Sequence, residues 1–151
     1  MVVSSATFIS DSTLFLRDLL LTNVTDPKSG ARPTGSVFVV TSYPERIVFY
    51  PLITIINDNF SAVNGGMNSE DMNVSMDFEV RVWARNVKER DTLAQNVVDV
   101  LRSKQTDAST GSIANNLFDF KVTSAVNVDE EGEAGIHSKV ISVTYQLFID
   151  T

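Results

Sequence analysis

Residues 73–84 read NVSMDFEVRVWA and decide the fold, because polar and apolar side chains alternate along almost the whole stretch. A period of two places successive side chains on opposite faces of a β-strand. The apolar set is Val74, Met76, Phe78, Val80, Val82 and Ala84, and the other set is Asn73, Ser75, Asp77, Glu79, Arg81 and Trp83. A strand with one buried and one wet face is typical of an antiparallel sheet.

A helix is predicted directly after this strand. Asn86 with Glu89 three residues later resembles a capping box, with Asn in place of the usual Ser or Thr. The apolar positions that follow at helical spacing are Val87, Leu93, Ala94, Val97, Val98 and Leu101. We therefore expect the helix to pack back on the sheet.

Shorter patterns predict the remaining elements. In chain order they are an apolar helix capped at Asp11 or Ser12, strands over 36–43 and 52–57, a hairpin excursion over 57–73, strands over 117–126 and 136–149, and an acidic turn over 128–135. This order predicts an α+β fold: a mixed, mainly antiparallel β-sheet with two main helices packed on one face. We expect a single domain over residues 1–151, with 1–10 as a flexible lead.

Composition excludes several classes of function. The net charge is −7 and the 12 basic residues are scattered, whereas a general grip on nucleic acid needs clustered Lys and Arg. The absence of cysteine removes disulfides, thiolate zinc sites and thiol catalysis. No stretch approaches the ~20 apolar residues of a membrane span, and the start lacks a basic secretory region, so we expect a cytosolic product.

The side chains that could carry chemistry form no recognisable site. His137 is the only histidine, and strand geometry turns its neighbour Ser138 to the opposite face. The acidic turn with Asp129, Glu130 and Glu131 lacks the alternating spacing of a calcium loop. We expect no catalytic, metal or cofactor site, and therefore no enzyme.

Trp83 allows two interpretations. It is the only tryptophan and lies on the face opposite the helix-packing residues. It is either an ordinary amphipathic residue at the rim or, with Arg81 and Glu79, part of a subunit contact, because aromatic residues commonly anchor interfaces.

The order of elements resembles a known family. A mid-strand proline in Tyr50-Pro51-Leu52, the strand end Val80-Arg-Val-Trp-Ala84, the helix of residues 89–101 (ERDTLAQNVVDVL) and the closing strand of residues 135–149 carry the resemblance. It covers most of residues 10–150. The sequence resembles the tail-terminator and head–tail joining (neck) proteins of long-tailed bacteriophages and related viruses.

The resemblance implies a structural virion protein that assembles into a ring, commonly six-fold. Such a ring caps the tail tube, ends its growth and joins it to the neck. The implied partners are copies of the same chain, the tail-tube protein, neck or connector proteins, and DNA that passes through the lumen without specific binding. The implied place is the virion tail or neck, after synthesis in the host cytoplasm, with no membrane.

The same resemblance assigns two loops to partners or to the lumen. Their residues are Asn64, Gly65, Gly66, Glu70 and Asp71 in the first loop, and Asp129, Glu130 and Glu131 in the second. A neck stopper, a tail-tube component and a non-viral protein-binding module remain alternatives.

Overall fold

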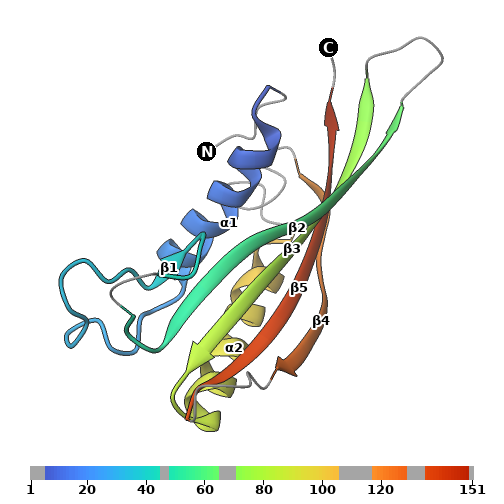
Figure 1. Ribbon diagram of the computed structural model, residues 1–151. Coiled ribbons are helices and arrows are strands. Elements are labelled where there is room, and N and C mark those ends of the chain that lie inside the picture. Colours follow the sequence, from blue (N-terminus) through green and yellow to red (C-terminus); the bar gives the residue numbers. More distant parts are fainter. Residues whose placement is uncertain (1–5, 45–47, 65–70, 106–116, 129–134, 150–151) are drawn as a thin grey trace.

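The computed structural model describes residues 6–44, 48–64, 71–105, 117–128 and 135–149. Its elements, in chain order, are α1 (Phe8–Asn23), β1 (Val39–Val40), β2 (Leu52–Asn64), β3 (Met72–Ala84), α2 (Val87–Ser103), β4 (Phe118–Val128) and β5 (His137–Ile149) (Figure 1). The predicted order of helices and strands is confirmed, and so is the α+β class.

The strands form one sheet in the order β1-β2-β3-β5-β4. β1 pairs in parallel with β2, and every other pair is antiparallel, which confirms a mixed, mainly antiparallel sheet. α2 carries the chain from β3 to β4, and β5 then returns between them. β4 and β2 therefore occupy opposite sides of the sheet.

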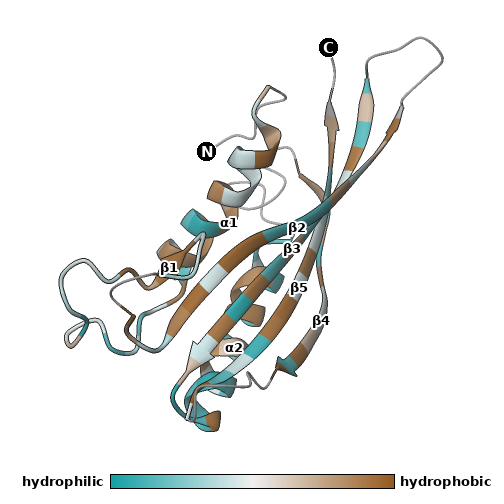
Figure 2. Cartoon of the chain, in the orientation of Figure 1, coloured by the Kyte–Doolittle hydropathy of each residue, from teal (hydrophilic) through white to brown (hydrophobic). Residues whose placement is uncertain are grey.

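Both helices pack on the same face of the sheet, as the sequence predicts. All six apolar residues of the β3 set are buried, and Figure 2 shows the matching alternation of hydrophobic and hydrophilic bands along the strands. An aromatic group lies at the centre: Tyr145 stacks between Phe78 and Phe120, with ring centroids 5.1 and 5.7 Å away. Phe15 of α1 meets this group edge-on. The alternation of residues 73–84 thus decides which face the helices cover.

The two helices begin differently from each other. The predicted cap of α2 is confirmed, because the Asn86 Oδ1 atom accepts a hydrogen bond of 2.8 Å from the Glu89 amide. The predicted cap of α1 is wrong: this helix starts at Phe8 after Thr7, so residues 8–10 do not belong to a loose lead. Ser12 could not cap a helix here, because its side chain is fully buried in the face that α1 packs on the sheet.

Two strand lengths differ from the prediction. The stretch 36–43 forms a strand only at Val39 and Val40, which pair with Ile53 and Thr54. β2 continues to Asn64, so most of the expected loop over 57–73 is a paired ribbon with β3. The polar composition of this ribbon hid it, because main-chain pairing needs no apolar rhythm when both faces are wet.

β4 contains an irregularity that changes the direction of its side chains. Phe118 pairs with Gln146 but Lys121 pairs with Thr144, so one extra residue is accommodated, and Asp119 has a φ of 51°. Phe118 is 56% exposed whereas Phe120 is 5% exposed, although strict alternation would place both on one face.

Candidate interaction surfaces

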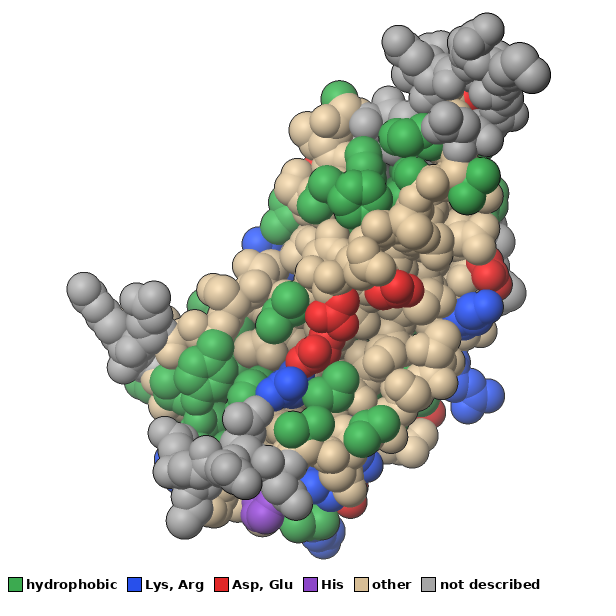
Figure 3. All heavy atoms as spheres, turned by 45° about the vertical axis from the view of Figure 1, so that its right-hand side comes forward, with side chains coloured by type: hydrophobic (Ala, Val, Ile, Leu, Met, Phe, Trp, Pro, Cys, Tyr) green, Lys and Arg blue, Asp and Glu red, His purple; other side chains and the backbone are tan. Residues whose placement is uncertain are grey.

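One whole face of the sheet is left uncovered by the helices, and we call it the open face. On its two central strands it consists of Ser75, Asp77, Glu79, Arg81 and Trp83 of β3 and Ser138, Val140, Ser142, Thr144, Gln146 and Phe148 of β5. Figure 3 shows acidic side chains gathered near its middle, with hydrophobic side chains towards both ends. Three apolar side chains on this face are well exposed: Phe148 and Val126 are more than half exposed, and Ile56 nearly half. The open face therefore offers small polar groups, negative charge and separate apolar spots.

Trp83 lies at one end of the open face and is held by residues of its own chain. Its indole N–H donates to the Thr54 hydroxyl at 3.1 Å. Tyr43 packs against the ring at 5.1 Å, and the Arg81 guanidinium lies 5.1 Å from the ring centroid. Arg81 also pairs with Glu79 at 2.8 Å. The three predicted contact residues thus adjoin one another, and Trp83 is half-buried before any partner arrives.

A small second core surrounds this tryptophan. Tyr50, Leu52 and Ile136 are its buried members, with Val40, Val48 and Trp83 packed against them. The hydroxyls of Tyr43 and Tyr50 share a hydrogen bond. The interpretation of Trp83 as a rim residue is supported by this packing, and the subunit contact remains a prediction.

Arg32 holds the segment that builds this end of the molecule, a role that was not predicted from the sequence. Its guanidinium makes two bonds to the Asp26 carboxylate, of 2.6 and 3.0 Å. It also donates to the main-chain carbonyls of Phe49 at 3.0 Å and Pro51 at 2.6 Å. Its side chain is only 7% exposed, and its guanidinium carbon lies 5.3 and 5.2 Å from the ring centroids of Phe38 and Phe49. We call this arrangement the Arg32 clamp.

The Arg32 clamp also sets the ionisation of Asp26. Burial alone would raise the pKa of this carboxyl, but the hydrogen bond from Arg32 and the amide of Lys28 outweigh it, so the pKa lies below its usual value. Asp26 is therefore charged over the whole neutral range. The only hint in the sequence is the spacing of Asp26 and Arg32 within a turn-rich loop.

The loop residues that the resemblance assigned to partners lie mostly outside the described residues. Asn64 is the last residue of β2, and Asp71 directly precedes β3, so both belong to the end of the β2–β3 ribbon. The predicted residues Gly65, Gly66, Glu70, Asp129, Glu130 and Glu131 lie outside the described part of the chain. Exposed apolar side chains accompany the ribbon, with Val63 70% exposed and Phe60 packed edge-on against Phe8 of α1.

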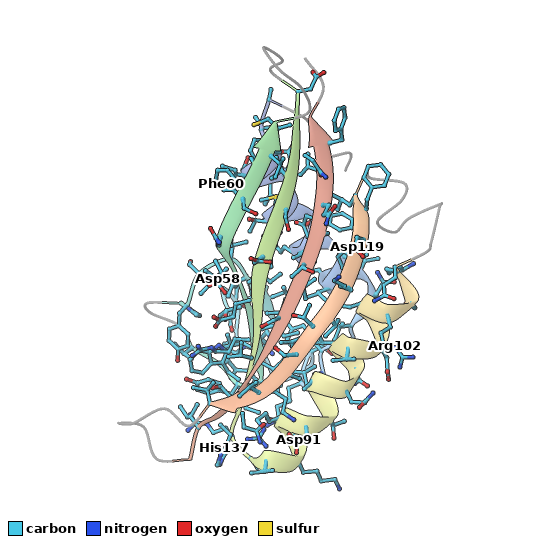
Figure 4. All side chains as sticks on the ribbon, turned by 90° about the vertical axis from the view of Figure 1, so that its right-hand side faces the viewer. Asp58, Phe60, Asp91, Arg102, Asp119 and His137 are labelled. Atoms are coloured by element: carbon cyan, nitrogen blue, oxygen red, sulfur yellow. The ribbon has the colours of Figure 1, made fainter. Side chains whose placement is uncertain are left out.

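His137 and its neighbour Ser138 do not form a nucleophile–base pair. Ser138 and His137 occupy opposite faces of β5, as their cross-strand partners Trp83 and Ala84 show. The Ser138 hydroxyl is buried and donates to the Val128 carbonyl at 2.8 Å. Figure 4 labels His137 at the same end of the molecule as Asp91.

Asp91 takes part in an ion-pair group at the start of α2. Its carboxylate pairs with Arg90 at 2.9 Å and Lys139 at 3.0 Å. Hydrogen bonds from Arg90 and then Lys139 lower the pKa of Asp91 below its usual value. This group ties α2 to β5.

The described residues offer neither a metal-binding cluster nor a membrane-spanning helix. No group of three or more His, Asp or Glu side chains within those residues could hold a metal ion. No helix in the described part of the chain has the length and hydrophobicity needed to cross a bilayer.

The fold of the chain is similar to that of a chain in a virion particle. No family model matches the sequence, and no curated protein does. A chain in a solved structure described as the virion of a native gene transfer agent (GTA) particle is similar in fold, with a TM-score of 0.57. The alignment covers 91% of this chain and 96% of that chain at 12% sequence identity. The chain is thus similar over nearly its whole length to the fold of one chain in a virion particle.

Proposed function

We propose that the protein is a non-enzymatic structural component of a phage-like virion. Its specific role would be that of a subunit in a ring that ends the tail tube and joins it to the neck. The partners would be copies of itself, the tail-tube protein and connector proteins, and the site of action would be the tail or neck of the particle.

The observation that carries this proposal is the fold similarity to a chain of a gene transfer agent virion over nearly the full length of both chains. The coverage matters because the similarity includes nearly all of the helices and strands described here, not one motif. The element order over residues 10–150 gives independent support, since it resembles the tail-terminator pattern.

The surface of the subunit suits assembly. A rotational ring needs two different patches on each copy, because each subunit contacts its neighbours through unlike surfaces. The sheet offers such an asymmetry: one face is covered by helices, the other is open, and its two sides end in unlike strands. The exposed apolar side chains Phe148 and Val126 supply area that a partner could bury.

The charge of the chain agrees with DNA passing close by without being held. The net charge is −7, and the carboxylates of Asp77 and Glu79 lie on the open face. A wall of the same sign as phosphate repels DNA and keeps it mobile. A face turned to the lumen would therefore let the genome slide past.

Deletion of the gene from a genome that produces particles tests the role. Loss of a tail terminator is expected to leave tails of uncontrolled length that are detached from heads, as seen by negative-stain electron microscopy. Absence of tails altogether would instead indicate a tube component, and intact heads that lose their DNA would indicate a neck stopper. Particles of normal form and infectivity would refute a virion role.

A measurement of mass in solution tests the self-assembly. Two samples are compared, the purified chain alone and the chain mixed with the tail-tube protein. At least one of them should contain a discrete ring. A chain that stays monomeric in both samples would favour a binding module that acts alone.

A further inference from the structure

The sheet of one subunit has two unpaired edges, on opposite sides. β4 is the last strand of the sheet, and β1 covers β2 only at Ile53 and Thr54. Within the described residues, no strand pairs with the outer side of β4 or with the outer side of β2 beyond Asn59. Figure 4 shows Asp58 and Phe60 along one side of the sheet and Asp119 on the other.

Each unpaired edge contains the same uncharged tetrapeptide. Residues 61–64 of β2 and residues 124–127 of β4 both read SAVN. Each run follows an irregularity, between Asn57 and Asn59 in β2 and between Val122 and Ser124 in β4, after which the pairing with the inner neighbour is regular. Ser61, Ala62 and Val63 are exposed, as are all four residues of the β4 run.

Exposed edges of this kind are unusual unless a partner strand covers them. Monomeric sheet proteins guard their edges with Lys, Pro, inward charges or bulges, because a free regular edge recruits other strands. Neither SAVN run contains a charge or a proline, and the bulges lie outside both runs. Because neither run carries a guard, we infer that these two stretches of edge are available for pairing.

We propose that the SAVN run of β2 in one copy pairs with the SAVN run of β4 in the next copy, so that the sheet continues around the ring. This inference rests on the proposed ring. β2 is antiparallel to β4, because three antiparallel steps separate them across the sheet. Copies related by rotation keep their strand directions, so the new contact is an antiparallel ladder, the more stable kind.

The register of this ladder is restricted by the faces of the two strands. Ser61 and Val63 share the open face with Ser124 and Val126, as their cross-strand partners show. A continuous open face therefore places Ser61 opposite Val126 and Val63 opposite Ser124. A slip by two residues keeps the faces, whereas a slip by one exchanges them.

A sheet that continues through successive copies in this register can close into a ring at a strand tilt typical of closed sheets. Across the sheet Ser61 aligns with Gln146 of β5 and Val126 aligns with Val140, an offset of six residues. At ~3.3 Å per residue this is about 20 Å along the strands, and four strand spacings of ~4.8 Å give about 19 Å across them. The ratio corresponds to a tilt of about 45°, close to the range of roughly 35–45° in closed sheets.

Cysteine cross-linking in the full chain tests the contact directly, because the natural sequence has no cysteine. The double variants Ser61→Cys/Val126→Cys and Val63→Cys/Ser124→Cys should form disulfides between copies on mild oxidation. Non-reducing gels should show a ladder that ends at the mass of the closed ring. Ser61→Cys/Ser124→Cys would detect a slip by two residues.

The matched control is Ser61→Cys/Ser142→Cys, which keeps one edge thiol and moves the other to the same face of the central strand β5. The amount of cross-linked product from this control should be less than a tenth of the amount from the edge pairs. A second comparison uses two exposed valines: Val126→Lys should abolish assembly, whereas Val37→Lys in the loop before β1 should leave it unchanged. Far-ultraviolet circular dichroism verifies that each variant is folded.

The outcomes separate this inference from the proposed function. If the mass in solution shows a ring but the edge cysteines form no disulfide, the edge contact is overturned and the proposed ring still stands. Absence of both rings and disulfides at millimolar concentration would overturn the edge contact and the self-assembly together. The presence of the chain in purified particles, measured by mass spectrometry, would still decide the virion role.

Discussion

Removal of the Arg32 guanidinium should destabilise the fold more than any surface change of equal size. The side chain is 7% exposed and serves one carboxylate and two main-chain carbonyls. In Arg32→Ala these three acceptors lose their bonds from the guanidinium, and Asp26 is left as a partly buried charge with only the Lys28 amide as donor. Removal of one partner of a buried pair costs about 3–5 kcal/mol, which is a large part of the roughly 5–15 kcal/mol that stabilises a domain.

Two further substitutions separate the effect of the charge from that of the planar guanidinium group. Arg32→Lys keeps the charge but not the planar fork that reaches Asp26, Phe49 and Pro51 at once, so we expect a loss of about 2 kcal/mol. Arg102→Ala on the exposed end of α2 is the control, with an expected loss of about 0.5 kcal/mol. The loss in free energy of unfolding should be largest for Arg32→Ala, smaller for Arg32→Lys and smallest for Arg102→Ala.

The assay is equilibrium unfolding in urea, followed by the fluorescence of Trp83. This is the only tryptophan, and it lies in the small core next to the Arg32 clamp, so its signal reports the relevant end of the molecule. Circular dichroism provides a second probe of the whole domain. A loss for Arg32→Ala no larger than that for Arg102→Ala would show that the clamp contributes nothing to stability.

Three further predictions use the same unfolding measurement. Asn86→Ala removes the confirmed cap of α2 and should cost about 1 kcal/mol, whereas Asn86→Asp should cost little, and equal effects would contradict the cap. The hydroxyls of Ser12 and Tyr145 are buried, and neither makes a hydrogen bond within the described residues. Burial raises the pKa of the Tyr145 hydroxyl, and the nearby Ser12 hydroxyl opposes this rise. Ser12→Ala and Tyr145→Phe should therefore be neutral or stabilising by about 1 kcal/mol, and a loss above that would indicate a missing partner. The pKa of Asp26 is lower in the folded than in the unfolded state, so its contribution to the free energy of unfolding is complete above about pH 4 and is lost as the pH falls through the folded pKa. The stability of Asp26→Asn should therefore depend less on pH in that window. An identical loss of stability with acid in both proteins would refute the link.

The parts of the fold that could be predicted are those with a strong local signal. Residues 73–84 alternate without a break in their apolar set, and Asn86 marks the start of the next helix, so the strand–helix unit was found with nearly correct bounds. β2 beyond Asn57 was missed, because its pairing with β3 is a main-chain effect that polar side chains do not reveal. The segment 36–43 was overestimated, since β-propensity alone does not say whether a neighbouring strand is within reach.

The candidate surfaces were predictable only in outline. The polar set of β3 indicated an uncovered face, and the structure has one. The position of Trp83 depends on Tyr43, 40 residues earlier, and the role of Arg32 depends on carbonyls 17 and 19 residues later. Such distant contacts arise from the path of the chain, which no short window of sequence contains.

The left-handed residue Asp119 determines which phenylalanine belongs to the hydrophobic interior. Because one additional residue fits between Phe118 and Lys121, the chain can send Phe120 inward to Tyr145 while Phe118 points outward. Deletion of Asp119 would make Phe118 and Phe120 neighbours, and simple alternation would then keep Phe118 outward and Phe120 inward. The left-handed backbone of Asp119 thus absorbs the additional residue of this strand end and keeps Phe120 in the core.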